Sequence, residues 1–266
     1  MPYIQETFRA PGFREVKKYH SARWGGKKTR NPNENQTDEA MKKGNQRRAK
    51  ERLYRLLATN FERDDYRVDL TYRDPPPEPE EAVKRVQKFI RKLRALYKKQ
   101  GTELKYIYVT EYIGHRIHHH LILSRCDRIG RREINSIWPY SELNYRSFRL
   151  YDGRPEDAQA LSTYLIKETS EKVRDRVQKT RWCASKNLKK PDVKKTIIYS
   201  RHWKENPKPP SGYQVHDVVN DFTEEGYPFQ WYRLIKEPER RKHENRTQPR
   251  RKRTQKTPPV PRRTSR

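Results

Sequence analysis

The sequence contains little apolar material. Hydrophobic residues make up 31% of the 266 positions, and the mean hydropathy is -1.34. A folded core must therefore come from part of the chain, with long polar segments outside it. No apolar run is long enough to span a bilayer, and the start, Met1–Thr7, lacks the apolar centre of a signal peptide. We therefore expect a cytoplasmic protein without membrane contact.

The sequence also has only two cysteines and lacks the spacing of a nucleotide-binding P-loop. Cys126 and Cys183 are too few for a disulfide framework, and no Cys-x-x-Cys spacing supports a structural zinc site. Their scarcity favours a reducing compartment. The segment Gly25-Gly26-Lys27-Lys28-Thr29 lacks the spacing of a P-loop, so the chain is not expected to carry a P-loop helicase.

Acidic residues are few relative to basic ones. Lys and Arg number 63 against 34 Asp and Glu, which gives a formal net charge of +29. A solubilising surface does not need so large an excess. Each phosphate that a lysine or arginine neutralises releases counterions, so this charge favours a nucleic-acid partner.

Apolar periodicity predicts an α+β fold. Val68, Leu70 and Tyr72 alternate with polar residues as in a half-buried strand, and Val86, Ile90 and Leu93 lie on one helical stripe. The expected elements are a helix at 45–60, a strand at 66–72, a helix at 80–100, strands at 106–112 and 117–123, a helix at 131–138, a strand at 146–151 and a helix at 155–171. The two adjacent strands predict a hairpin, and hence a central antiparallel sheet with helices packed on it.

The rest of the chain divides by composition. Residues 1–44 are polar and basic, and they predict a loosely ordered N-terminal arm. Residues 45–235 hold the expected domain with a C-terminal extension, including a strand at 196–199 and aromatic residues that either stack on unpaired bases or belong to the core. Residues 236–266 carry 13 Lys or Arg and 3 Asp or Glu, which predicts a disordered cationic tail.

The second hairpin strand contains three consecutive histidines, His118, His119 and His120. Residues two apart in a strand face the same side, so His118 and His120 point together and His119 points away. With a turn at Gly114-His115, Glu111 lies opposite His118 and Val109 opposite His120. Two imidazoles and a carboxylate would then converge on a divalent metal with positions left for substrate. The alternative is a strand whose histidines merely cover the sheet.

A tyrosine and a lysine share one surface of the 155–171 helix. Ala158, Leu161 and Leu165 form its expected core stripe, and Tyr164 and Lys167 are surface neighbours three residues apart. A phenol has a pKa near 10 and needs a metal, a base or a nearby cation to attack a phosphate. Lys167 supplies such a charge. The alternative is a tyrosine at the rim of the core beside a snorkelling lysine.

Together these residues resemble the HUH endonucleases, a superfamily of rolling-circle replication initiators, conjugative relaxases and single-strand transposases. The name describes two histidines around a hydrophobic residue, and here His119 replaces that residue. The strand ending in Thr71-Tyr72 looks like the first motif, and Tyr164 with Lys167 looks like the third. Ile137-Trp138-Pro139 and the basic segment 184–191 look like single-tyrosine replication proteins of bacterial phages and plasmids.

The resemblance implies a mechanism and partners. Mg²⁺ or Mn²⁺ on Glu111, His118 and His120 would polarise a phosphate of single-stranded or hairpin origin DNA. Tyr164 would attack it to give a 5′-phosphotyrosine, and later rejoin the strand. Host helicase and polymerase would complete replication in the bacterial cytoplasm. The residues expected to contact DNA are Thr71, Tyr72, Lys186, Lys189 and Lys190. The alternatives are a non-enzymatic nucleic-acid-binding protein and an HUH relaxase or single-strand transposase.

Overall fold

A computed structural model describes residues 3–21, 38–73, 75–113, 116–170, 180–200, 202–223 and 226–237. In these residues the chain forms two five-stranded antiparallel sheets and four helices. The α+β fold predicted from the sequence is therefore confirmed. The turn at Gly114-His115 and the tail from residue 238 lie outside the described residues.

The first sheet joins the two ends of the chain. Its strand order is β8-β1-β2-β10-β9. The strands are β1 (Tyr3–Ala10), β2 (Phe13–His20), β8 (Asp192–Ile198), β9 (Tyr213–Phe222) and β10 (Pro228–Lys236). The prediction of a loosely ordered arm over residues 1–44 is thus wrong for the β1–β2 hairpin. Apolar Ile4 and Phe8 alternate there with residues of the opposite face, so one side of the hairpin is buried.

The second sheet contains the predicted hairpin at its centre. Its order is β6-β3-β5-β4-β7, and every pairing is antiparallel. The strands are β3 (Tyr66–Leu70), β4 (Tyr106–Ile113), β5 (Arg116–Leu123), β6 (Phe148–Leu150) and β7 (Cys183–Ala184). Lys236, assigned to the disordered tail from the sequence, ends β10 of the other sheet instead.

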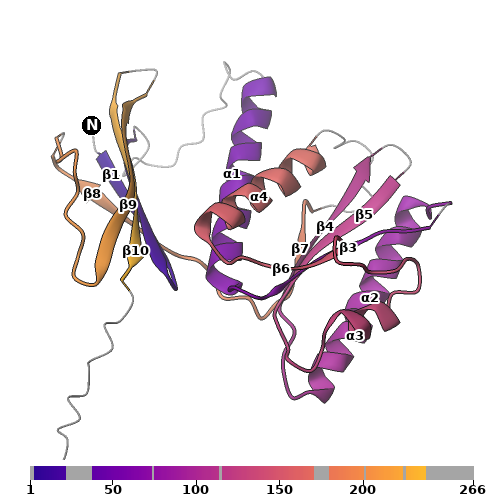
Figure 1. Ribbon diagram of the computed structural model, residues 1–266. Helices are drawn as coiled ribbons and strands as arrows, with labels where there is room; N and C mark the ends of the chain where they lie inside the picture. Colours follow the sequence, from indigo (N-terminus) through magenta and orange to yellow (C-terminus); the bar gives the residue numbers. More distant parts are fainter. Residues whose placement is uncertain are drawn as a thin grey trace, which may run out of the picture.

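Helices cover both faces of the second sheet (Figure 1). The helices are α1 (Asp38–Asn60), α2 (Pro79–Lys99), α3 (Arg131–Ser136) and α4 (Pro155–Ser170). The buried stripe of α2, with Val86 and Leu93, packs against Leu121 of β5. On the other face, α1 and α4 pack side by side and lie between the two sheets. The layers therefore run sheet, α1 and α4, sheet, α2 and α3.

The helix that carries Tyr164 is fixed by its apolar stripe. Ala158, Leu161 and Leu165 are at most 3% exposed, as predicted, and they share a core cluster with Val109 of β4 and Leu53 of α1. The cluster also holds Phe8 and Phe13 of the first sheet. One core thus holds α4 against the face of the sheet that presents the histidines.

Candidate active site

The strand register brings the predicted residues to one face of the second sheet. Glu111 pairs with His118 and Val109 pairs with His120, as the hairpin register predicts. The neighbouring strand adds a residue, because Asp69 of β3 pairs with His120 from the other side. Paired residues share a face, so Asp69, Glu111, His118 and His120 all lie on the side covered by α4.

Carboxylates engage both ring nitrogens of His120. Its Nδ1 lies 2.7 Å from Oδ1 of Asp69, and its Nε2 lies 2.7 Å from Oε2 of Glu111. Glu111 is 3% exposed, and the other oxygen of Asp69 contacts the guanidinium of Arg149. The ring is therefore fixed in orientation between two strands.

These contacts set the protonation of the two histidines. Burial lowers the pKa of His120, but the hydrogen bonds and charges of Asp69 and Glu111 outweigh burial and raise it to about 9. For His118, burial is the largest influence and the pKa falls below its usual value. At neutral pH the His118 ring is thus uncharged, while the raised pKa favours the protonated form of His120.

His119 faces the opposite side of the sheet, as predicted from the alternation. It is fully buried, with Nδ1 3.0 Å from Oγ1 of Thr110 and Nε2 2.7 Å from the hydroxyl of Tyr72. Burial lowers its pKa to about 3, so the ring is neutral. Tyr72 also packs edge-on against Trp138. Its hydroxyl points into this internal network, away from the face that carries His118 and His120.

Tyr164 of α4 reaches the cluster from above the sheet. Its hydroxyl lies 3.4 Å from Oε2 of Glu111, and its ring meets the His120 ring edge-on with centroids 5.5 Å apart. The side chain is 41% exposed, so the phenol is accessible from solvent. Lys167 lies on the same helix, but its side chain is outside the described residues.

An open cavity of about 370 Å³ contains this group. Its lining joins the sheet face to α4 and to the loop before β6. The residues are Asp69, Thr71, Glu111, His118, His120, Glu142, Asn144, Arg146, Ser147 and Tyr164. Thr71 lines the cavity, and its hydroxyl donates to Ser141. Its contact with DNA stays a prediction. The loop residues were not predicted, because a loop shows no periodicity that places it over a sheet.

The predicted basic residues lie away from this cavity, after β7. Lys186, Lys189 and Lys190 are all exposed, and Lys186 borders a larger cavity beside α2. The backbone of Lys189 is anchored to α1, since its N–H donates to the side chain of Asn60 at 2.6 Å. Their role as DNA contacts stays a prediction.

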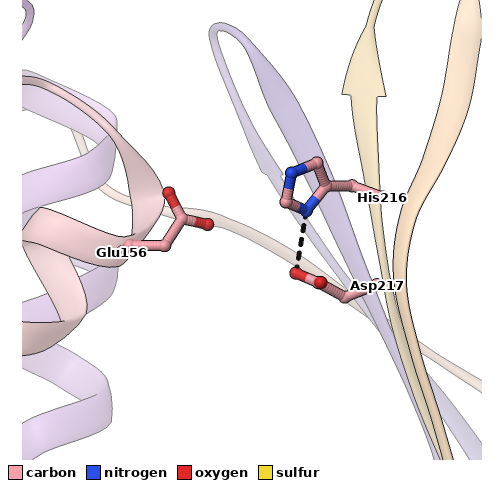
Figure 2. Close-up of side chains that lie close together, drawn as sticks. All are labelled: Glu156, His216 and Asp217. Carbon is pink, nitrogen blue, oxygen red and sulfur yellow. Dashed lines mark ion pairs between the residues drawn. The ribbon is translucent and has the colours of Figure 1, made fainter.

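A separate acidic cluster lies between α4 and the first sheet. In the described part of the chain, Glu156, His216 and Asp217 are the one group whose possible ligand atoms all lie within 4.8 Å of one another (Figure 2). Arg233 already neutralises this cluster, because its Nη1 contacts Glu156 and lies 3.4 Å from Oδ2 of Asp217. We therefore regard it as an ion-pair network that joins α4 to the sheet.

Comparison with known proteins gives one match. The family model described as Replication-associated protein ORF2/G2P matches residues 65–173, which is less than half of the chain. The matched segment contains Asp69, Glu111, His118, His120 and Tyr164. It supports a replication-associated protein and suggests that the chain binds DNA. No curated protein and no solved structure matches the chain significantly. Among the described residues, no helix is long and apolar enough to cross a membrane.

Proposed function

We propose that this protein starts rolling-circle replication by nicking and rejoining single-stranded DNA through Tyr164. The observation that carries the proposal is the position of the Tyr164 hydroxyl, 3.4 Å from Glu111 in a cavity shared with His118 and His120. This cavity lies within the segment that matches the replication-associated family. An exposed phenol beside a carboxylate and two imidazoles suits nucleophilic attack on a phosphodiester.

The residue types in the cavity suit a divalent cation, although the ligand atoms of Glu111, His118 and His120 do not all lie within 4.8 Å of one another. Glu111 offers a carboxylate oxygen and His118 a neutral imidazole, and His120 is oriented through Nδ1 by Asp69, as histidine ligands of metals commonly are. We therefore propose Glu111, His118 and His120 as the residues that hold Mg²⁺ or Mn²⁺. When bound, the ion would polarise the scissile phosphate and stabilise the charge that develops on it.

The side chains of Tyr164 and Glu111 take part in the cleavage and joining steps. Oε2 of Glu111 accepts the hydrogen bond of the Tyr164 hydroxyl, so the phenolic proton points at a carboxylate as the oxygen becomes the nucleophile. Attack forms the Tyr164–phosphorus bond and breaks the bond to the 3′ oxygen, which leaves as a hydroxyl. The 3′-hydroxyl then serves as primer. Reversal of the step with another 3′-hydroxyl rejoins the strand without nucleotide hydrolysis.

The test is formation of a covalent adduct. A pooled library of single-stranded and hairpin oligonucleotides, labelled at the 3′ end, is incubated with the full chain and Mn²⁺ or EDTA. A 5′-phosphotyrosine retains the 3′ label on the protein through denaturing electrophoresis. We expect an adduct with Mn²⁺, none with EDTA, and none in Tyr164→Phe.

Tyr145→Phe is the matched control, because Tyr145 is 73% exposed, precedes β6 and does not line the cavity. It is expected to form the adduct at normal yield. An adduct of normal yield in Tyr164→Phe would reject Tyr164 as nucleophile. If the wild type bound oligonucleotides of the library but formed no adduct, the result would support a non-enzymatic nucleic-acid-binding protein instead.

A further inference from the structure

A second cavity, of about 590 Å³, lies between α1 and the segment that leads into β7. One wall is formed by Asn45, Arg48, Ala49 and Arg52, which recur along one side of α1. The other wall is Thr180-Arg181-Trp182. We call this cavity the arginine groove. Its arginines and Trp182 lie outside the segment matched by the replication-associated family.

The arginine groove has a concentrated and unneutralised charge. Three of its seven lining residues are arginines and none is acidic. None of the three guanidinium groups forms an ion pair with a described carboxylate, although α1 carries Glu51. Glu51 is bound instead by Lys17 and Arg55 on another side of the helix. Mutual repulsion of three close guanidinium groups is unfavourable unless an anion joins them.

Arg181, which lines the groove, has a buried guanidinium nitrogen. Its Nη1 is inaccessible to water and has no hydrogen-bond partner among the described residues. A buried N–H without an acceptor costs about 1–3 kcal/mol, so such groups are rare in folded proteins. Because Nη1 is closed to water, an anion in the groove would be held by the charge and the remaining N–H groups of Arg181, which lines the cavity. The guanidinium fork matches the spacing of phosphate oxygens better than that of a single-atom anion.

The floor and the far wall of the groove indicate which phosphate compound binds. Ala49 is 9% exposed and Trp182 is partly buried against the same core, so the cavity combines cationic rims with an apolar surface. Single-stranded nucleic acid requires this combination, since arginines follow its backbone while an indole or apolar surface receives a base. A duplex keeps its bases stacked inside and offers only phosphates.

We infer that the arginine groove binds the single-stranded DNA that leads to or from the Tyr164 cavity. The inference rests on the proposed function for the identity of the strand. Ala49 of the groove and Leu165 of α4 belong to one core cluster, and α1 packs along α4. The helix α1, which forms one wall of the groove, therefore lies beside the helix that carries the nucleophile, on the same side of the second sheet (Figure 1).

The test measures binding without chemistry, in a Tyr164→Phe background with EDTA. Fluorescence anisotropy follows a labelled oligodeoxythymidine of about 20 nucleotides, and a duplex of the same length. The groove variant combines Arg48→Ala, Arg52→Ala and Arg181→Ala. The control variant removes three exposed cations elsewhere, Lys88→Ala, Arg91→Ala and Arg132→Ala. Both variants lose the same charge.

We expect the groove variant to bind the single strand at least tenfold more weakly than the control variant. The slope of its log affinity against log salt should be smaller by up to about 2 than that of the Tyr164→Phe parent. Each phosphate contact on a single strand contributes about 0.7 to this slope. Equal affinities of the two variants would overturn the inference, and so would a loss confined to the duplex.

Circular dichroism and thermal unfolding show whether the groove variant folds. If it does not, Arg181→Gln alone serves, with a loss of about threefold or more expected for one phosphate contact and no loss overturning the inference. Adduct formation by the chain with Tyr164 intact is measured separately. Equal binding with a normal adduct would therefore reject the groove alone, and normal groove binding without any adduct would reject the nicking function alone.

Discussion

The hydroxyl of Tyr164 and Oε2 of Glu111 lie 3.4 Å apart, although 52 residues separate them in the chain. The contact joins a helix to the strand that pairs with the histidine strand. Glu111 thereby serves two partners, because the same oxygen lies 2.7 Å from Nε2 of His120. Its substitution should disturb the orientation of the nucleophile and of the imidazole together.

Glu111→Gln should therefore lower the yield of the Mn²⁺-dependent adduct by about 100-fold, as expected when a preorganised charged group is lost. Glu142→Gln is the control, because Glu142 lines the same cavity and forms no ion pair within the described residues. We expect the control to change the yield by less than about threefold. Similar losses in both variants would show that only the total negative charge of the cavity matters.

Asp69 should act through His120. Asn at this position keeps the size of the side chain but removes the charge that orients the ring at Nδ1. Asp69→Asn should weaken Mn²⁺ binding by about 10–100-fold, the usual effect of losing a group that orients a ligand. Titration calorimetry on the DNA-free protein measures this affinity. Asp127→Asn is the control, since the Asp127 side chain is 84% exposed, and equal affinities in the two variants would refute a role for Asp69.

The local part of this site follows from the sequence. Alternation places His118 and His120 on one face, and the hairpin register predicted from the sequence brings Glu111 opposite His118, as the structure has it. These relationships depend on residues within one hairpin. Asp69 could not be assigned in this way, because its position opposite His120 depends on pairing between strands 51 residues apart.

The predicted strand at 196–199 overlaps β8, but the β1–β2 hairpin of the first sheet was missed for a different reason. Its buried face contains charged residues, Glu6 and Glu15, each about 6% exposed, so β1 and β2 do not show a simple apolar alternation. Ion pairs with Arg55 and Arg233 allow these carboxylates to be buried. These partners lie far away in the sequence. The hairpin sequence alone therefore indicates a polar, basic segment.

The buried Glu6 predicts acid lability. Burial raises its pKa, but the hydrogen bonds and charges of Lys195 and Arg55 outweigh burial and lower the pKa from 4.5 to about 2. A carboxyl with a depressed pKa stabilises the fold above pH 4.5, and this contribution disappears as the pH falls through about 2. The contribution at neutral pH is about 3 kcal/mol.

Urea unfolding of Glu6→Gln measures this contribution. The free energy of unfolding should fall by about 3 kcal/mol at neutral pH, and the difference from wild type should shrink as the pH approaches 2. Glu205→Gln, at an exposed position, should differ little from wild type at either pH. A difference for Glu6→Gln that is constant with pH would mean that packing, and not charge, stabilises this position.

Arg233 should be the most sensitive ion-pairing residue between α4 and the first sheet. Its side chain is 3% exposed, and it contacts Glu15 of β2, Asp217 of β9 and Glu156 of α4. Arg233→Met leaves Glu15 buried without its cation, although the hydroxyl of Tyr54 still donates to it. Loss of one partner of a buried ion pair typically lowers the free energy of unfolding by about 3–5 kcal/mol.

The double variant Arg233→Met with Glu15→Gln separates two contributions to the free energy of unfolding. One is the loss of the ion pair, and the other is the cost of burying an unpaired charge. Because glutamine at position 15 needs no counter-ion, the double variant should recover part of the stability that Arg233→Met loses in urea unfolding. A double variant less stable than Arg233→Met alone would mean that Glu15 has an independent stabilising partner. Glu156 lies in the first turn of α4, so loss of its contact with Arg233 should also lower the adduct yield of Tyr164 in the folded variant.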